Sequence, residues 1–405
     1  MTIVLAYSGG LDTSVALHWL REKYDTDVIA YCANLGQVED LGDVADRAKR
    51  AGASDVIVED VRARFLREFA LPALAAGAVY EGKYFLAAPL SRPLIAQRLV
   101  EIAADTGSRM VAHGATGKGN DQVRFYTSVR ALDPTLTVLS PVIDWELTSR
   151  RSEIEYADKY GIDIGASKTS PYSIDTNIWG TSIECGDLDN VDQAPPRDAW
   201  QITTDPIDAA NSPEQVRIEF RQGIPISLNG RELDPVAFVE ELNIIAAGHG
   251  VGRTEILENR IVGFKSRGVY ESPAATVLHA AYRDLESLVF DRETLHFKRS
   301  IADRYGELVY YGYWFSDLRR ALDGLCEQLA PRLTGEVTVE LFKGRCHCVA
   351  RRSELFSRYN TALADYEESD TFDHAAGAGF AYAWALPLVD HSRLSSRSDT
   401  VSAAQ

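Results

Sequence analysis

The sequence predicts an α/β protein that begins with a doubly wound parallel sheet, and three observations support this fold class. Short apolar runs alternate with helical runs from residue 1 to residue 165. A glycine-rich turn directly follows the first apolar run, at the place where parallel sheets bind ligands. The chain has 405 residues, of which 45% are hydrophobic, so it can bury more than one sizeable core. Alternating strands and helices imply parallel strands with helices on both faces of the sheet.

The elements of this first part follow one another regularly. The expected strands are short and rich in β-branched residues, and they are Ile3–Tyr7, Asp27–Ala33, Asp55–Asp60, Arg109–His113 and Thr137–Leu139. The expected helices are Thr13–Tyr24, Glu39–Ala51, Arg62–Ala76, Leu90–Thr106 and Ser149–Tyr160. The carboxyl ends of parallel strands meet at one edge of a sheet. We therefore expect Ser8, Asn34–Gln37 and Gly114–Thr116 to converge in one crevice.

The remainder of the chain predicts a second, α+β domain and a C-terminal segment. Residues 170–206 are polar and contain four prolines, so we expect a functional or interdomain loop there. Strands are expected at Val216–Phe220, Ile224–Leu228 and Gly335–Phe342, and helices at Asp234–Ala247, Pro273–Phe290 and Phe315–Leu329. The predicted domains are 1–165 and 166–353, followed by a segment at 354–405 whose Ser-rich end, Ser392–Gln405, is expected to be frayed.

Composition excludes several classes of protein. The formal net charge of −17 disfavours a nucleic-acid partner, because phosphates would be repelled. No apolar run approaches the roughly 18–20 residues of a membrane span. The chain begins directly with a core strand, so we expect no signal peptide and a cytoplasmic protein. Its five cysteines are an odd number, which suits a reducing compartment.

Cys346-His347-Cys348 invites two interpretations. Thiols and an imidazole are metal ligands, but no second ligand pair follows at zinc-ribbon spacing. The run from Val337 to Ala350 is strand-like, and alternation places both thiols on one face of a strand. We favour the interpretation that Cys346 and Cys348 are side chains on one face of a strand over the interpretation that they bind a metal.

Ser8-Gly9-Gly10-Leu11-Asp12-Thr13-Ser14 predicts a phosphate-binding loop. Glycines let the backbone approach an anion closely, and the free N–H groups of the following helix point to the same place. The alternative is an ordinary glycine turn between strand and helix. A Walker loop is excluded, because Gly114–Gly119 has the wrong spacing and the wrong residue after its lysine.

Three further blocks combine polar and charged residues in short stretches: Ala112–Phe125, Ser170–Glu184 and Gly248–Glu255 continuing into Glu258–Glu271. The first holds an amide, a carboxylate and two cations, a set that can bind a zwitterion. Each of the other two, taken alone, is typical of a polar loop.

The Ser8 loop resembles the PP-loop of the ATP pyrophosphatases, whose fold is adenine nucleotide alpha-hydrolase-like and which cleave between the α- and β-phosphates. Taken in order, the four blocks resemble argininosuccinate synthase, and the similarity extends from Thr2 to about Phe380 and includes Tyr310–Ser316. The resemblance implies a ligase of arginine biosynthesis that joins citrulline to aspartate with ATP and Mg²⁺ and releases AMP and pyrophosphate. It also implies a homotetramer in which the C-terminal segment reaches across subunits.

The resemblance assigns site residues by motif. For ATP these are Ala6, Tyr7, Ser8, Gly9, Gly10, Leu11, Asp12, Thr13, Ser14, Ala33 and Gly114. For aspartate they are Thr116, Asn120 and Asp121. For citrulline they are Tyr84, Asn120, Arg124, Ser173, Ser182, Glu258 and Tyr270. Asp12 is the one catalytic candidate, as a group that orients magnesium on the phosphates, and we interpret His113 as a packing residue.

One departure from the family concerns the stretch after Tyr84. The family usually carries a hydroxyl residue just before the Arg-Pro pair, where this chain has Ala88-Pro89, and Ser91 is expected to cap the following helix. This leaves open a ligase of specialised metabolism that uses another ureido or carboxylate acceptor. Two other classes compete with these interpretations: a PP-loop protein that modifies tRNA and a non-catalytic nucleotide-binding regulator.

Overall fold

The computed structural model describes residues 2–163, 171–367 and 370–402. They belong to two compact units, Met1–Phe356 and Ser357–Gln405.

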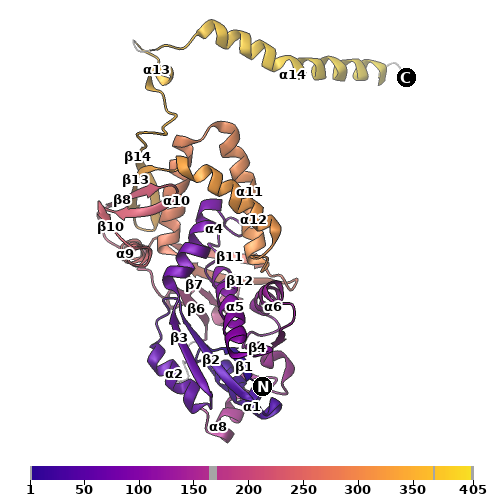
Figure 1. Ribbon diagram of the computed structural model, residues 1–405. Helices are drawn as coiled ribbons and strands as arrows, with labels where there is room; N and C mark the ends of the chain where they lie inside the picture. The colour runs from indigo at the N-terminus through magenta and orange to yellow at the C-terminus, as the bar shows by residue number, and fades with distance from the viewer. Residues whose placement is uncertain (1, 164–170, 368–369, 403–405) are drawn as a thin grey trace. The chain divides into compact units, whose positions relative to one another are not determined.

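The first part of the chain forms the predicted parallel sheet, with strand order β3-β2-β1-β4-β5 (Figure 1). The strands are β1 (Thr2–Ala6), β2 (Asp27–Asn34), β3 (Asp55–Asp60), β4 (Met110–His113) and β5 (Thr137–Leu139). Ile3 and Leu5 pack with one group of helices, whereas Val4, between them in β1, packs with the other. This alternation is what a sheet covered on both faces requires, so the doubly wound fold class is confirmed.

The helices of this part cover the two faces of the sheet. They are α1 (Leu11–Tyr24), α2 (Leu41–Arg50), α3 (Arg62–Phe65), the π-helical turn η1 (Leu66–Ala70), α4 (Leu71–Ala76), α5 (Ala87–Thr106), α6 (Asp121–Leu132), α7 (Pro141–Asp144) and α8 (Arg150–Tyr160). Residues of α1, α2 and α8 join Ile3 in one apolar cluster, and residues of α5 and α6 join Val4 in the other.

The next part of the chain adds two antiparallel sheets. Their orders are β10-β9-β8-β13-β14 and β11-β12-β7-β6. The strands are β6 (Ser173–Asn177), β7 (Gly180–Glu184), β8 (Glu214–Arg221), β9 (Ile224–Leu228), β10 (Arg231–Glu232), β11 (Arg253–Asn259), β12 (Lys265–Glu271), β13 (Gly335–Phe342) and β14 (Arg345–Arg352).

Two expectations about loops are wrong. The stretch 170–206 contains the paired strands β6 and β7, and residues 253–271 form the paired strands β11 and β12. These strands are rich in polar residues, so the apolar pattern that marks a strand is missing from their sequence. Their stability comes from backbone pairing with neighbouring strands, which hydropathy does not report. Ser170, the first residue of the third block, lies outside the described residues.

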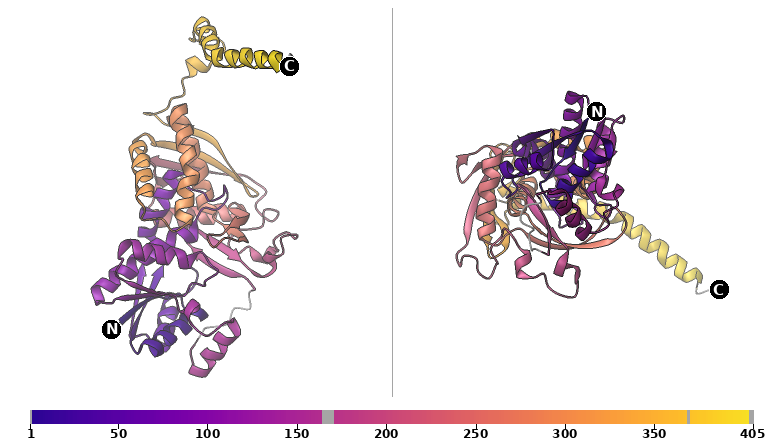
Figure 2. Two further views of the ribbon diagram at one scale, coloured as in Figure 1. Left: turned by 90° about the vertical axis from the view of Figure 1, so that its right-hand side faces the viewer. Right: turned by 90° about the horizontal axis from the view of Figure 1, so that it is seen from below.

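The helices of the second part are α9 (Pro235–Gly248), α10 (Pro273–Val289), α11 (Arg292–Tyr310) and α12 (Asp317–Leu329), with short 3₁₀ turns η2 (Gly186–Asp189), η3 (Arg197–Ala199) and η4 (Ala330–Arg332). The apolar core does not stop where the parallel sheet ends. Phe65 and Leu90 belong to the same buried cluster as Phe220 and Leu278. Figure 2 shows this compact unit from two further sides. The predicted boundary at 165–166 lies outside the described residues, and the division into 1–165, 166–353 and 354–405 stays a prediction.

A buried carboxylate fastens the long connection after β7. Glu271, at the end of β12, is fully buried. It accepts hydrogen bonds from the backbone N–H groups of Gln201 (2.6 Å), Ile202 (3.1 Å) and Thr203 (2.9 Å) and from the Thr203 hydroxyl (2.5 Å). The Glu271 carboxylate therefore accepts the backbone hydrogen bonds of this segment, as the carbonyl groups of a neighbouring strand do in a sheet.

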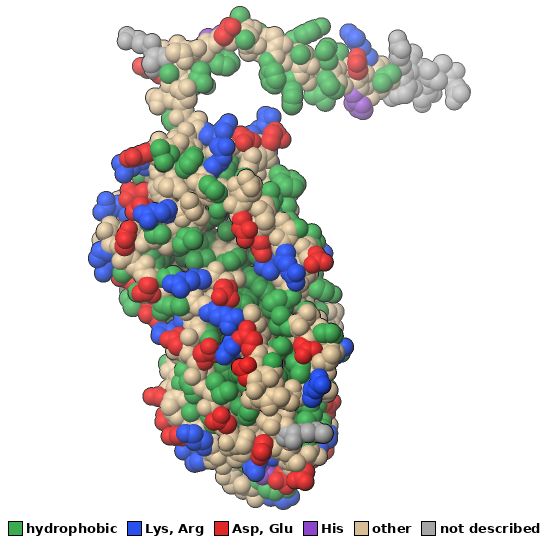
Figure 3. All heavy atoms as spheres, in the orientation of Figure 1, with side chains coloured by type: hydrophobic (Ala, Val, Ile, Leu, Met, Phe, Trp, Pro, Cys, Tyr) green, Lys and Arg blue, Asp and Glu red, His purple; other side chains and the backbone are tan. Residues whose placement is uncertain are grey.

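The second unit contains α13 (Thr361–Ala364) and α14 (His374–Ser402). The Ser-rich end that was expected to be frayed is helical as far as Ser402, so that expectation is wrong for the described residues. The helix exposes large apolar side chains, among them Phe380, Tyr382, Trp384 and Leu388 (Figure 3). Among the described helices, none is long and apolar enough to cross a membrane.

Candidate active site

The glycine-rich turn after β1 is built as a cradle for an anion. Gly9 has a φ of +78°, a conformation that favours glycine, and a Cβ there would lie 2.8 Å from the Arg47 guanidinium. The Ser8 and Thr13 hydroxyls lie 3.2 Å apart, and the Tyr7 and Ser14 hydroxyls lie 2.8 Å apart. The first turn of α1 has no side-chain cap, so its N-terminus is available to a phosphate.

The loop after β4 lies directly against this turn. A Cβ on Gly114 would come within 2.6 Å of the Thr13 Cγ2 atom, so only glycine fits there without a shift. Ala33, near the end of β2, is on the strand beside β1. The structure therefore brings together the three predicted segments at the carboxyl edge of adjacent strands.

Asp12 has a neighbour that the sequence analysis did not anticipate. Glu153, on α8, is buried beside Asp12. Burial, followed by the nearby Asp12 carboxylate, raises the pKa of Glu153 to about 7. The described residues contain no group of three or more metal-ligating His, Cys, Asp or Glu side chains. A pair of carboxylates at a phosphate loop suits Mg²⁺ that is held mainly by the nucleotide itself.

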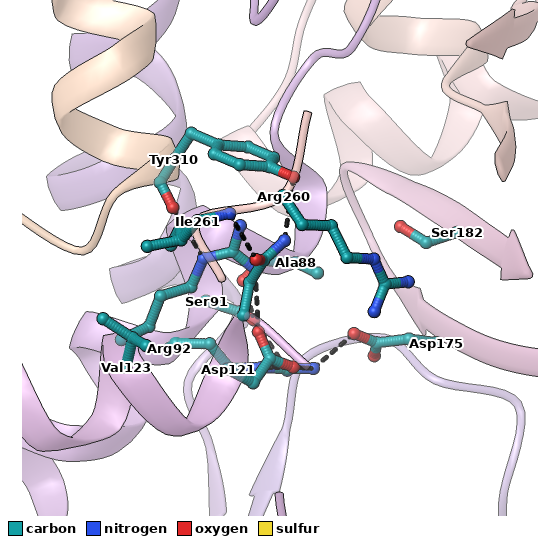
Figure 4. Close-up of polar contacts among 12 residues, drawn as sticks. Ala88, Ser91, Arg92, Asp121, Val123, Asp175, Ser182, Arg260, Ile261 and Tyr310 are labelled. Carbon is teal, nitrogen blue, oxygen red and sulfur yellow. Dashed lines mark hydrogen bonds and ion pairs between the residues drawn. The ribbon is translucent and has the colours of Figure 1, made fainter. Parts of the chain in front are cut away.

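The amino-acid part of the site begins at Asn120, which precedes α6. Its side-chain Nδ2 donates to the Tyr310 hydroxyl at 2.8 Å, and its Oδ1 accepts from the Ile261 backbone N–H at 2.9 Å (Figure 4). Both ends of the amide are thus fixed, which gives this side chain one orientation.

A buried group of four predicted citrulline residues lies on β7, β11, β12 and the segment before α5. The Tyr270 hydroxyl donates to Glu258 at 2.8 Å, the Tyr84 and Tyr270 rings stack at 4.0 Å, and the Tyr84 hydroxyl lies 3.2 Å from that of Ser182. Burial and the nearby Glu258 charge raise the pKa of Tyr270 well above its ordinary value. Ser173 differs from this group, because it is exposed at the start of β6.

Two arginines hold Asp121. Arg92 Nε donates to one carboxylate oxygen at 2.9 Å, Arg124 donates to the other at 2.8 Å, and Arg92 also pairs with Asp175 (Figure 4). Burial opposes ionisation, but the Arg92 and Arg124 charges outweigh it and hold the pKa of Asp121 well below its usual range. Thr116, the other predicted aspartate ligand, is exposed in the loop after β4.

Comparison with known proteins agrees with this arrangement. Family models match the chain as "Arginosuccinate synthase N-terminal HUP domain" over residues 2–163 and "Arginosuccinate synthase C-terminal domain" over residues 172–390. The chain belongs to the argininosuccinate synthase family.

Individual relatives lead to the same family. A protein of Rhodococcoides fascians named argininosuccinate synthase is 71% identical over 390 residues, which cover 96% of this chain and 99% of the relative. Relatives of the same name from Aquifex aeolicus (strain VF5) and Chlorobium phaeobacteroides (strain BS1) are 51% and 48% identical, and each alignment covers at least 95% of both chains. The resemblance predicted from the four blocks is confirmed, and with it the class of enzyme, a ligase.

Ala88-Pro89, the stretch that departs from the argininosuccinate synthase pattern, lies in the first turn of α5. Helix α5 begins at Ala87, so Ser91 lies inside it and does not cap it. The Ser91 hydroxyl donates to the Ala88 carbonyl at 2.8 Å and accepts from Arg92 at 3.1 Å. The N-cap prediction is therefore wrong, because the helix starts one turn earlier. Pro89 sits in the first turn, where a missing N–H is tolerated.

The interpretation of His113 as a packing residue agrees with its surroundings. Its ring stacks on Phe125 at 5.1 Å, and its two nitrogens meet the Ala115 N–H and the Ser140 hydroxyl. Burial lowers the pKa of His113 to about 4, so the ring is neutral near pH 7. Cys346 and Cys348 lie on β14 beside an apolar cluster, as the strand interpretation expects.

Four residues of the site escaped the sequence analysis as ligands or partners: Arg92, Glu153, Arg260 and Tyr310. Arg260 directly follows β11, pairs with Glu184, lies 3.9 Å from Glu258 and donates to the Lys118 carbonyl at 3.3 Å. The one signal available was position: Arg260 lies in the fourth block, Tyr310 begins the segment 310–316, and Arg92 belongs to the Arg-Pro pair that follows Ala88-Pro89. Their contacts depend on partners far away in the sequence.

Proposed function

We propose that this chain joins L-citrulline to L-aspartate, with ATP cleaved to AMP and pyrophosphate, in arginine biosynthesis. The observation that carries the proposal is the loop between β4 and α6. At Gly114 it touches the nucleotide turn, and at Asn120 it joins the buried amino-acid group. One short loop therefore connects the place for the α-phosphate with the place for the ureido group.

The chemistry follows from the weakness of a ureido carbon as an electrophile, because its nitrogen lone pairs donate into it. The ureido oxygen instead attacks the α-phosphorus of ATP, and pyrophosphate leaves. The aspartate amine then displaces AMP from the adenylated ureido carbon. The protein has to hold three reactants in line and neutralise charge, so positioning and electrostatics dominate catalysis.

The named residues divide this work. Glycines and hydroxyls of the turn after β1 bind the phosphates. Glu258 accepts the citrulline ammonium and Arg124 pairs with its carboxylate, while Asp121 accepts the aspartate ammonium. Asp12 orients the nucleotide, and Mg²⁺, when bound with it, supplies charge neutralisation for the phosphates. Thr116 and Ser173 add hydroxyls from the exposed side.

The remaining parts of the proposal concern assembly and location. The apolar side chains exposed along α14 support an oligomer, and we propose a homotetramer in the cytoplasm. The relatives share the name argininosuccinate synthase, which supports citrulline as the acceptor over another ureido or carboxylate compound.

The test is product identification from the purified full chain. With citrulline, aspartate, ATP and Mg²⁺, we expect argininosuccinate, AMP and pyrophosphate in equal amounts, measured by mass spectrometry and nucleotide chromatography. Omission of either amino acid should abolish argininosuccinate. Formation of ADP and phosphate, or pyrophosphate release with another acceptor but not with citrulline, would contradict the proposal.

A further inference from the structure

Tyr310 ends α11 and is fully buried among the predicted ligands of the amino-acid site. The resemblance includes its segment, 310–316, but assigns that segment no role. Its hydroxyl forms a hydrogen bond with Asn120, which Figure 4 draws as a dashed line at the Tyr310 hydroxyl. The side chain therefore reaches the site from an element that contributes none of the predicted ligands.

The hydroxyl of Tyr310 holds one of those ligands. It accepts the hydrogen bond from Asn120 Nδ2 at 2.8 Å. The Ile261 N–H donates to the other end of the same amide at 2.9 Å. The Asn120 side chain is therefore held between the Tyr310 hydroxyl and the Ile261 backbone.

The ring and the carbonyl of Tyr310 hold a second ligand. Arg124 Nε donates to the Tyr310 carbonyl at 2.9 Å, and the Arg124 guanidinium lies 4.8 Å from the centre of the ring. On its other side the ring stacks on Tyr80 at 3.6 Å. Gly312, with a φ of +79°, brings the following backbone against α6, where a Cβ would lie 3.0 Å from the Arg124 Cα atom.

We propose that Tyr310 is a positioning residue that aligns Asn120 and Arg124 for the ureido substrate. The inference rests on the proposed function, because both ligands were assigned to citrulline by the resemblance. The hydroxyl of Tyr310 contacts Asn120, and its ring and backbone carbonyl contact Arg124. Removal of the hydroxyl alone should therefore disturb that substrate selectively.

The experiment compares Tyr310→Phe with Tyr305→Phe. Tyr305 lies on the same helix, is equally buried and donates to Asp323 at 2.7 Å, so its variant also loses one buried, hydrogen-bonded hydroxyl. For Tyr310→Phe we expect a KM for citrulline raised about 10-fold, because the buried Asn120 amide is left without its acceptor. The KM for ATP should stay within about 2-fold of wild type. Tyr305→Phe should leave all three KM values within that range.

Tyr80→Leu supplies a second variant that leaves the Tyr310 hydroxyl in place. It removes the ring beneath Tyr310, and we expect the same selectivity for citrulline. Equal changes in all KM values, or unchanged kinetics with a lowered Tm as in Tyr305→Phe, would overturn the proposal in favour of a structural role. Absence of argininosuccinate from wild type would instead overturn the proposed function, and calorimetric titration of citrulline into wild type and Tyr310→Phe would then test Tyr310 separately.

Discussion

The nucleotide turn, which is the segment from Tyr7 to Ser14 that we propose binds ATP, differs in construction from the amino-acid group, which comprises the residues that we propose bind citrulline and aspartate. One loop connects the two regions. The turn from Tyr7 to Ser14 is contiguous, and the hydroxyl hydrogen bonds of Tyr7, Ser8 and Thr13 join residues within it. The amino-acid group is assembled from several elements, and Asn120 and Tyr310 lie 190 positions apart in the sequence. The turn can be recognised in the amino-acid sequence because its residues are consecutive. The amino-acid group forms only when the chain has folded, because its residues come from distant parts of the sequence. The comparison also predicts that substitutions in the two regions affect different substrates.

The largest effects are expected at the two acidic ligands of the amino-acid group. Asp121→Asn should weaken aspartate use and Glu258→Gln should weaken citrulline use, each by about 10- to 150-fold, because each loses a charge-assisted hydrogen bond. The measurement is kcat/KM for each substrate with the others saturating.

Asp175→Asn is the matched control for Asp121. It also removes a carboxylate partner of Arg92, but it is not a predicted ligand. A loss of aspartate use as large as that of Asp121→Asn would show that the ion pair, and not ligand binding, accounts for the effect. If Asp121→Asn and Glu258→Gln each lower kcat/KM equally for aspartate and citrulline, the assignment of the two residues to separate amino-acid sites is wrong.

A smaller effect is expected where the two regions touch. Gly114→Ala places a Cβ 2.6 Å from Thr13, so the nucleotide turn must shift. Overpacking of this kind costs about 1–3 kcal/mol, which predicts a KM for ATP raised about 5- to 150-fold. Gly117→Ala, whose Cβ would meet Ile143 at an ordinary 3.6 Å, should behave as wild type. A citrulline KM that changes as much as the ATP KM in Gly114→Ala would mean that the two regions are not separable.

Glu153 gives the nucleotide region a pH dependence of stability. Its pKa is raised from 4.5 to about 7, so its contribution to the free energy of unfolding is fully present below about pH 4.5 and is lost as pH rises through 7. Glu153→Gln mimics the protonated form. Its advantage over wild type in the free energy of unfolding should be about 1–2 kcal/mol larger at pH 8 than at pH 5. Urea unfolding at both pH values measures this. Glu155→Gln, on the exposed side of α8, is the control, and a pH-independent difference for Glu153→Gln would refute the assignment.

The smallest effect is expected at Pro89. Pro89→Ser introduces a hydroxyl at the edge of the proposed citrulline site, and one neutral hydrogen bond is worth about 0.5–1.5 kcal/mol. We expect a KM for citrulline lowered about 2- to 13-fold, measured by initial rates, with the KM for aspartate unchanged. An unchanged citrulline KM would show that this position does not reach the substrate.

The sequence predicted the parallel sheet well, because strands such as Ile3–Tyr7 are buried on both faces and therefore apolar throughout. It failed for β6, β7, β11 and β12, whose side chains line a polar site. It predicted ligands that lie within recognisable blocks, such as Asn120 and Glu258, and both of these side chains are buried. It could not predict that Arg92 and Arg124 share Asp121, or that Glu153 approaches Asp12. Those contacts arise only when α5, α6 and α8 are in place.

The hydrogen bonds that the Glu271 carboxylate accepts from the segment after β7 have a consequence for amide hydrogen exchange. The N–H groups of Gln201, Ile202 and Thr203 lie outside any strand, yet all three donate to a fully buried carboxylate. They should exchange with solvent as slowly as amides in a sheet. Glu271 directly follows Tyr270 in β12. Exchange at these three amides therefore reports how often the end of β12, beside the proposed ureido site, opens, and how strongly each substrate keeps it closed.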